Sequence, residues 1–426
     1  MSPLLQIRGG RRLDPATGLN SVGDLWIQDG RIVPAPTHPP GNVRIFDAAG
    51  QWVAPSLTDL HVHLREPGND AAETVESGTR AAAAGGFGTV VSMPNTRPPT
   101  DSPELVRETI EKARRAGFAH VRPSACLTRN RAGEETADLE ALAEAGAAVF
   151  TDDGSTVLSD AVMREAMIRA ARLNRAVMDH AQDPAAERRG VLHEGEAARR
   201  LGLPGIPSSA EARIIRRDFA LALETGCAIH IQHLTSLEGV ALLRDAKRQG
   251  VRASAEVTPH HLAFCDEDIP GNDANWKMNP PLRGPADRES LIEAVCDGTI
   301  ACFATDHAPH TAESKAGGFA TAPFGVIGLE TALGVTYTAL VKNRRMDVMT
   351  WLRLWTTGPA GLLGFPLPTL APGAPADLVV MDLESEWTVK RFVSRSVNSP
   401  FIGRRLTGCA TATFLGGRDV YRRNVS

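Results

Sequence analysis

The chain of 426 residues is 42% hydrophobic and 23% charged, and its formal net charge is −4. These are ordinary globular values, and the length allows one large domain with a smaller companion, or two or three ordinary domains. The charge balance excludes an electrostatic surface for nucleic acid or an anionic membrane, and no apolar run is long enough to span a bilayer. The start lacks a signal-peptide core and the six scattered cysteines form no CxxC pair, so we expect free thiols in a cytoplasmic protein.

Both ends of the chain are typical of short strands separated by tight turns. The first 55 residues contain LLQIRGG, SVGDLWIQDGRIV and VRIFDAAGQWV, with clusters of Gly, Pro, Asp and Asn between them. Residues from 366 onward repeat this style in PADLVVMDLESEWTV and TGCATATFLGGRDVY. We therefore predict that residues 1–55 and 366–426 pair into one small β-sandwich domain.

The middle of the chain, residues 56–365, alternates short apolar runs with helical segments. The eight apolar runs are WVAPSLTDL, GTVVSMPN, VRPSACLT, AAVFTDD, AVMDHA, AIHIQHLT, RASAEVTP and IACFATDHAP. Ser102 and Ser159 fit as N-caps of two intervening helices, and Gly117, Gly226 and Gly250 fit as C-terminal caps. Eight strands alternating with helices over roughly 300 residues predict an α/β fold, a (β/α)8 TIM barrel, with a doubly wound open sheet as the alternative.

Imidazole and carboxylate side chains close five of the eight apolar runs: His61 and His63, Asp153, His180, His233 and Asp306. In a barrel of this type the carboxyl ends of the strands meet on one face, where active sites lie. Four histidines and two aspartates exceed the three or four protein ligands of a single zinc ion, and they suit two divalent ions that share a carboxylate. Zinc fits these ligands, as do cobalt and manganese.

Residues with other chemistry follow some of these runs. Arg65 lies two residues beyond His63, on the same side if the chain stays extended, and its planar guanidinium suits bidentate binding of a carboxylate. A salt bridge to Glu66 or to a loop carboxylate is the alternative. Asn95 closes the second run, and residues 310–325 are rich in Gly and Ala without a strong helix or strand pattern. That segment fits a mobile lid over the site or a static surface loop.

Taken together, these motifs resemble the dihydroorotases of the amidohydrolase superfamily. The matching stretches follow the family's order between residues 50 and 335: DLHVHLREPG, SMPNT, FTDDG, MDHA, QHLT, NPPLR and TDHAPHTAESK. The branch they resemble is the bacterial type in which an aspartate replaces the carboxylated lysine of relatives. The resemblance implies the same barrel and the same composite sheet domain.

The resemblance also implies a metal centre of two zinc ions per chain, bridged by Asp153 and a hydroxide. The other ligands are three strand-end residues for the first ion and two for the second: His61, His63 and Asp306, then His180 and His233. Asp306 is implied to act as general acid and base in addition to binding metal. Proton transfer by such a positioned group is typically worth roughly 10²–10⁴-fold in rate.

Seven residues match the family's substrate contacts: His63, Arg65, Asn95, Asn279, His310, Phe324 and Gly325. Arg65, Asn95 and His310 match the grip on the substrate carboxylate. Asn279 and the backbone of the last two residues match contacts to the pyrimidine ring. The implied ligand is therefore a small cyclic molecule that bears a carboxylate.

The activity implied is reversible hydrolysis of (S)-dihydroorotate to N-carbamoyl-L-aspartate, a step of de novo pyrimidine biosynthesis. Related hydantoinases, dihydropyrimidinases and allantoinases carry a lysine near the end of strand four, and the segment AGAAVFTDDGSTVLSD contains none. Those cyclic amidohydrolases are the first alternative. A non-catalytic scaffold for aspartate transcarbamoylase, which should have lost ligands, is the second. A homodimer and a complex with the transcarbamoylase stay open.

Overall fold

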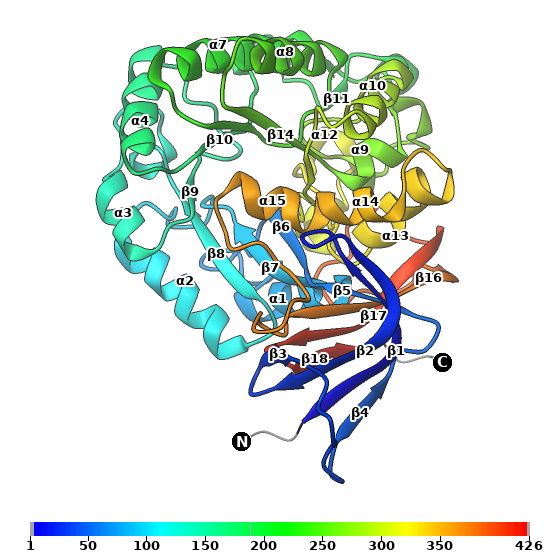
Figure 1. Ribbon diagram of the computed structural model, residues 1–426. Helices are drawn as coiled ribbons and strands as arrows, with labels where there is room; N and C mark the ends of the chain where they lie inside the picture. Colours follow the sequence, from blue (N-terminus) through cyan, green and yellow to red (C-terminus); the bar gives the residue numbers. More distant parts are fainter. Residues whose placement is uncertain (1–3, 188, 424–426) are drawn as a thin grey trace.

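The computed structural model describes residues 4–187 and 189–423 as a barrel joined to a separate sheet (Figure 1). Eight parallel strands form the barrel in the order β15-β14-β13-β10-β9-β8-β7-β6. Their bounds are Leu57–Val62 for β6, Phe87–Ser92 for β7, His120–Ala125 for β8, Val149–Phe150 for β9, Val177–Asp179 for β10, Ile229–Ile231 for β13, Ala253–Val257 for β14 and Cys302–Phe303 for β15. A parallel bridge between Val62 and His307 joins the first strand to the segment after the last, so the barrel is nearly closed. The predicted barrel is confirmed, and the open sheet is excluded.

Helices surround the barrel and follow most of its strands (Figure 1). The longer ones are α1 Val75–Gly85, α2 Pro103–Ala116, α3 Leu139–Ala145, α4 Asp160–Arg172, α7 Ser209–Thr225, α8 Leu237–Arg248, α10 Pro285–Cys296 and α14 Val348–Trp355. The hydroxyl of Ser102 accepts a hydrogen bond from the Leu105 amide and caps α2, and Ser159 caps α4 in the same way. Gly117 and Gly226 end α2 and α7 in the left-handed conformation, at φ 68°. These four caps match the sequence prediction. For Gly250 the prediction is wrong by one residue, because Gln249 caps α8 in a right-handed conformation and Gly250 follows it.

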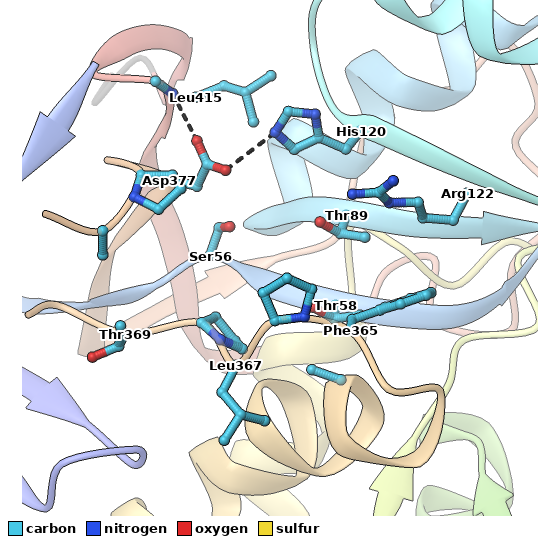
Figure 2. Close-up of a pocket in the computed structure, with 16 residues that line it drawn as sticks. Ser56, Thr58, Thr89, His120, Arg122, Phe365, Leu367, Thr369, Asp377 and Leu415 are labelled. Atoms are coloured by element: carbon cyan, nitrogen blue, oxygen red, sulfur yellow. Dashed lines mark hydrogen bonds and ion pairs between the residues drawn. The ribbon is translucent and has the colours of Figure 1, made fainter. Parts of the chain in front are cut away.

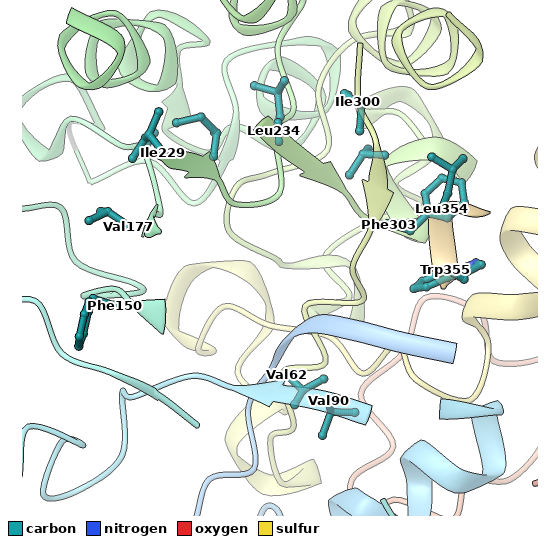
Figure 3. Close-up of a cluster of buried hydrophobic side chains, with 14 of the residues drawn as sticks. Val62, Val90, Phe150, Val177, Ile229, Leu234, Ile300, Phe303, Leu354 and Trp355 are labelled. Carbon is teal, nitrogen blue, oxygen red and sulfur yellow. The ribbon is translucent and has the colours of Figure 1, made fainter. Parts of the chain in front are cut away.

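A buried apolar layer fills the space between the strands and the surrounding helices (Figure 3). Val90, Val177 and Ile229 contribute to it from three different strands, and all three are fully buried. Trp355, at the end of α14, packs against Phe303 of β15 with ring centroids 5.0 Å apart. Burying each such side chain stabilises the fold by roughly 1.5–3 kcal/mol. This layer fixes the strands, and therefore fixes the side chains at their carboxyl ends.

The two ends of the chain form one further sheet, in the order β18-β17-β16-β5-β1-β2-β3, with β4 paired to β1. The bounds are Leu5–Asp14 for β1, Leu19–Gln28 for β2, Arg31–Val33 for β3, Arg44–Asp47 for β4, Trp52–Pro55 for β5, Leu378–Thr388 for β16, Arg405–Leu415 for β17 and Arg418–Arg422 for β18. The antiparallel pairing of β16 with β5 joins the two ends of the chain. Phe46 of β4 packs edge-on against Phe414 of β17, so the sheet folds over its own core. The predicted β domain built from both termini is confirmed.

The terminal sheet extends to Pro55, and the barrel begins at Leu57. The exact domain boundaries, 1–55 with 366–426 and 56–365, stay a prediction. Within the described ranges, no helix is both long enough and apolar enough to cross a membrane.

Several short elements lie outside the eightfold pattern and have no counterpart in the sequence prediction. They are α5 Pro184–Glu187, β11 Leu192–His193, α6 Glu196–Leu201, β12 Gly205–Ile206, α9 Pro259–Ala263, α11 Ala312–Lys315, α12 Gly318–Thr321, α13 Ala332–Thr336 and α15 Thr357–Leu362. Strands β11 and β12 pair with each other in a separate two-stranded sheet. Helices α11 and α12 lie in the segment 310–325, which the sequence showed without a regular pattern.

Candidate active site

Two cavities lie at opposite ends of the barrel. One of about 720 Å³ opens at the amino-terminal ends of β6, β7 and β8, where Thr58, Thr89 and His120 line it and the His120 Nε2 lies 3.1 Å from the Asp377 carboxylate (Figure 2). It contains no predicted site residue. A smaller pocket of about 230 Å³ opens at the carboxyl ends and is lined by His63, Arg65, Asn95, Asp153, Gly154, His180, His233, Asn279, Asp306, Ala308, His310, Phe324 and Gly325. This pocket is below the roughly 300–1,000 Å³ of drug-sized ligand sites, so it suits a small molecule.

The pocket brings together every substrate and metal residue predicted from the sequence except His61, which is buried with no exposed surface. Its imidazole belongs to both groups of active-site ligand atoms that lie within 4.8 Å of one another. The first group is His61, His63 and Asp306, and the second is His61, Asp153 and His233. The structure therefore contains histidine–aspartate groups able to hold metal at the predicted strand ends.

The Asp153 carboxylate lies at the centre of this cluster. One of its oxygens lies 3.3 Å from His61 Nε2 and 3.7 Å from His180 Nδ1, and the other lies 3.7 Å from His63 Nε2. Burial alone would raise the pKa of Asp153, but the charge of His61 and the contacts with His180 hold it well below its usual value. An ionised carboxylate facing three imidazoles suits a bridging ligand.

The hydrogen bonds around the histidines leave the correct nitrogens free for metal. His61 Nδ1 donates to Glu256 Oε1 at 2.7 Å, and His63 Nδ1 donates to Asn95 Oδ1 at 2.9 Å. The Nε2 of each ring then faces the cluster, where it would offer its lone pair to a bound ion once the ring is neutral. His180 is oriented in the opposite sense, because its Nε2 lies 2.8 Å from the Gln182 side-chain oxygen and its Nδ1 faces Asp153.

Two buried nitrogens show that protein contacts alone do not complete this cluster. His61 Nε2 and His233 Nδ1 are buried and have no hydrogen-bond partner within residues 4–187 and 189–423. Ligands of a tetrahedral zinc at about 2.0–2.1 Å lie roughly 3.3 Å apart, which is close to the observed spacing of His61 Nε2 from Asp153. The residues present therefore fit metal ions. The division of the six ligands between two ions stays a prediction.

Sequence reasoning missed Glu256, whose carboxylate contacts the cluster through His61. Its second oxygen, Oε2, accepts a hydrogen bond from His230 Nε2 at 3.2 Å, and His230 Nδ1 contacts the Ser254 hydroxyl at 2.8 Å. These contacts hold the pKa of Glu256 down to about 2 despite the opposing effect of burial. A glutamate inside the seventh apolar run was the available signal, since carboxylates are rarely buried unless they are paired. Cys302 lies close to His230 and Glu256, so these three residues form a third group of possible metal ligands. Both oxygens of Glu256 already contact histidine nitrogens, those of His61 and His230.

Arg65 lines the pocket and has a strained backbone, with φ at 61°. Its Nε donates to the Pro309 carbonyl at 3.1 Å, and its Nη2 lies 3.4 Å from His310 Nε2. Burial lowers the pKa of Arg65 to about 10. It forms no ion pair with a carboxylate in the described part of the chain, so the predicted alternative of a salt bridge to Glu66 is wrong; Glu66 pairs instead with Lys112.

The remaining predicted substrate residues line the same pocket. Asn95 donates through Nδ2 to Asp153 Oδ2 at 3.0 Å, so its amide contacts the metal cluster. His310 Nε2 lies 2.7 Å from the Phe324 carbonyl, and burial together with the charge of Arg65 lowers the pKa of His310 to about 3, which keeps the imidazole neutral. The Oδ1 atom of Asn279 is buried without a partner in the same described ranges. It is a free acceptor at the pocket.

Comparison with known sequences agrees with the motifs. A family model described as dihydro-orotase-like matches residues 50–239. The chain is 48% identical over 404 residues to a protein named dihydroorotase from Geobacillus sp. (strain WCH70), a match that covers 94% of this chain and 95% of the relative. It is 49% identical over 384 residues to the dihydroorotase of Bacillus caldolyticus, with 90% of each chain covered.

Solved structures share the architecture. The L-hydantoinase (dihydropyrimidinase) from Arthrobacter aurescens superposes with a TM-score of 0.87 at 25% sequence identity, and the match covers 100% of this chain and 97% of that one. The two sequence relatives named dihydroorotase are about twice as identical to this chain as the L-hydantoinase is. With histidines and aspartates at the mouth of the barrel and near-full-length matches at almost half identity, the chain belongs to the dihydroorotase family of the amidohydrolase superfamily.

Proposed function

We propose that the protein is a dihydroorotase that interconverts (S)-dihydroorotate and N-carbamoyl-L-aspartate with the help of two zinc ions. The observation that carries the proposal is Arg65, a desolvated guanidinium that has no carboxylate partner in the described residues and lies in the wall of a small pocket. Such a cation is best satisfied by a ligand that brings its own carboxylate. Dihydroorotate carries one beside the scissile amide.

Arg65 also distinguishes this substrate from the uncharged rings of related enzymes. Hydantoin and dihydrouracil contain the cyclic amide but no carboxylate, so they cannot form the bidentate pair with a guanidinium. The structural likeness to an L-hydantoinase concerns the architecture of the chain. The substrate class is argued from Arg65, with the neutral His310 beside it and the amide of Asn95 near the cluster.

The histidine–aspartate cluster would hold the two zinc ions. We propose His61, His63 and Asp306 for one ion and His180 and His233 for the other, with the ionised Asp153 between them. When bound, the ions supply a water activated for attack at neutral pH and a Lewis acid for the scissile carbonyl.

Asp306 is proposed as the group that moves the proton. It follows β15 at a backbone φ of 45°, and one carboxylate oxygen lies 3.0 Å from His63 Nε2. In hydrolysis a carboxylate oxygen of Asp306 takes the proton that the attacking water loses and delivers it to the ring nitrogen as the C–N bond breaks. In ring closure the same oxygen takes the proton from the attacking carbamoyl nitrogen and passes it to the oxygen that the carboxylate carbon loses, which leaves as water with a second proton from solvent. Closure consumes one proton overall, so lower pH favours the ring.

The rest of the pocket would orient the ring. The unpartnered Oδ1 of Asn279 can accept a hydrogen bond from a ring N–H. The backbone of Phe324 and Gly325 forms the wall beyond it.

A substrate panel tests this function. Protein of known zinc content is assayed with dihydroorotate, dihydrouracil and hydantoin, and N-carbamoyl-L-aspartate is assayed in the closing direction. We expect turnover of dihydroorotate and N-carbamoyl-L-aspartate only. Turnover of the uncharged rings without activity on dihydroorotate would show a hydantoinase-like enzyme, and zinc well below one ion per chain with no turnover at all would show a scaffold.

A further inference from the structure

Two buried lysines hold the loop that forms one wall of the pocket. The Nζ of Lys315 donates to the carbonyls of Lys277 at 3.2 Å, Pro323 at 2.9 Å and Gly325 at 2.8 Å. An ammonium has three donors, so these three acceptors use all of them. The side chain is only 7% exposed, so few contacts with water remain.

Lys277 completes the same arrangement from the other side. Its Nζ donates to the carbonyls of Phe319 at 2.5 Å and Ala322 at 2.6 Å, and it lies 4.5 Å from the centroid of the Phe324 ring. Its own carbonyl accepts from the Gly325 amide at 3.0 Å. Together the two ammonium groups contact both ends of the segment 319–325, Phe319 at one end and residues 322–325 at the other.

Neither ammonium has a carboxylate partner in the part of the chain that the structure describes. Lys112 and Lys342, in contrast, both pair with glutamates. Burial removes water from the ammonium group, and carbonyl oxygens alone do not replace that hydration fully. Burial therefore favours the neutral amine and lowers the pKa of Lys315 to about 7. Such an arrangement persists only where the surrounding contacts fix it strongly.

The composition of the chain points the same way. Lysine is rare, with six among 46 basic residues, and arginine supplies the other forty. A guanidinium is a planar fork, whereas an ammonium is a compact group that can direct three bonds to three separate carbonyls. Lysine at 277 and 315 therefore matches a geometry that arginine does not provide.

We propose that Lys315 and Lys277 are positioning residues that hold the segment 319–325 against the pocket, and so set the wall that contacts the substrate ring. Phe324 and Gly325 line the pocket, and the Phe324 carbonyl also contacts His310, which neighbours Arg65. Release of the segment would displace the ring contacts and the carboxylate contacts together while leaving the metal ligands in place. The role in substrate binding rests on the proposed function, whereas the holding of the segment does not.

The test compares Lys315→Met with a matched control, Lys247→Met. Lys247 also donates to a backbone carbonyl, that of Thr299, but it lies on α8 and contacts no pocket residue. We measure KM and kcat for dihydroorotate, zinc content, melting temperature and hydrogen exchange of peptides across 316–326. For Lys315→Met we expect KM to rise about tenfold or more, which corresponds to the loss of hydrogen bonds from a charged donor, with a smaller change in kcat. Exchange should accelerate within 316–326 only, and the zinc content should stay at the wild-type level.

Lys315→Arg should fail to restore KM, because a planar fork cannot reach the three carbonyls. If Lys315→Met does not fold, Lys277→Met, which removes the contacts to Phe319 and Ala322, gives the same readouts. Wild-type KM together with wild-type exchange of 316–326 would overturn the proposal. So would failure of both variants to fold, because the lysines would then be general stability residues. If wild type shows no activity on dihydroorotate, the exchange measurement still decides whether the lysines hold the segment.

Discussion

Removal of the Arg65 guanidinium tests the carboxylate recognition in a way that the structure makes specific. In Arg65→Gln the protein loses two internal contacts, the hydrogen bond to the Pro309 carbonyl and the 3.4 Å contact with His310 Nε2, and no ion pair. The fold should therefore be little affected, with a melting temperature close to that of wild type. The substrate, in contrast, loses a bidentate, charge-assisted pair. Two such bonds at about 1.5–3 kcal/mol each predict a loss of roughly 3–6 kcal/mol in transition-state binding.

That loss corresponds to a fall of roughly 10²–10⁴-fold in kcat/KM for dihydroorotate. The assay uses variant and wild-type protein of equal zinc content in both directions of the reaction. Arg122→Gln is the matched control, because Arg122 also has no ion pair in the described chain but borders the cavity at the other end of the barrel. A kcat/KM for Arg65→Gln within about threefold of wild type, at equal zinc content, would refute the assignment of Arg65.

Three further predictions concern the metal cluster and the stability of the fold. Asp306→Ala should lower kcat by roughly 10²–10⁴-fold with an unchanged circular dichroism spectrum; retained turnover would remove Asp306 from the mechanism. Glu256→Gln should weaken zinc binding roughly 10–100-fold in a chelator competition, because His61 loses the carboxylate that orients it; unchanged zinc affinity would contradict this. Burial raises the pKa of Glu330 to about 7, above its ordinary 4.5, so its contribution to stability is complete below pH 4.5 and is lost as pH rises through 7. Glu330→Gln should therefore show a smaller fall in melting temperature than wild type between pH 5 and 8. Equal falls for the two proteins would contradict the raised pKa of Glu330.

The architecture followed from the sequence because its signals are local. Each barrel strand is a short apolar run, and residues such as Ser102 and Gly117 mark helix ends through bonds to neighbours three or four positions away. The site followed for a related reason. Once the runs are strands of one barrel, His61, Asp153 and Asp306 must meet at its mouth, although they are far apart in the chain.

The supporting contacts could not be predicted in this way, because they depend on tertiary geometry. Glu256 meets His61 across 195 positions of sequence, and no periodic pattern marks that pair. The segment 310–325 looks irregular in sequence because Lys315 and Lys277 hold it by bonds to backbone carbonyls, which any residue type supplies. Its short helices α11 and α12 were missed for that reason.

The most direct test of the proposed site is a crystal structure of the zinc-loaded protein with N-carbamoyl-L-aspartate, with anomalous scattering measured at the zinc edge. We expect two zinc peaks, one beside His61, His63 and Asp306 and one beside His180 and His233, with Asp153 between them. We also expect a ligand carboxylate paired with the Arg65 guanidinium. No zinc peak at these residues, or a ligand whose carboxylates both lie away from Arg65, would contradict the proposed site.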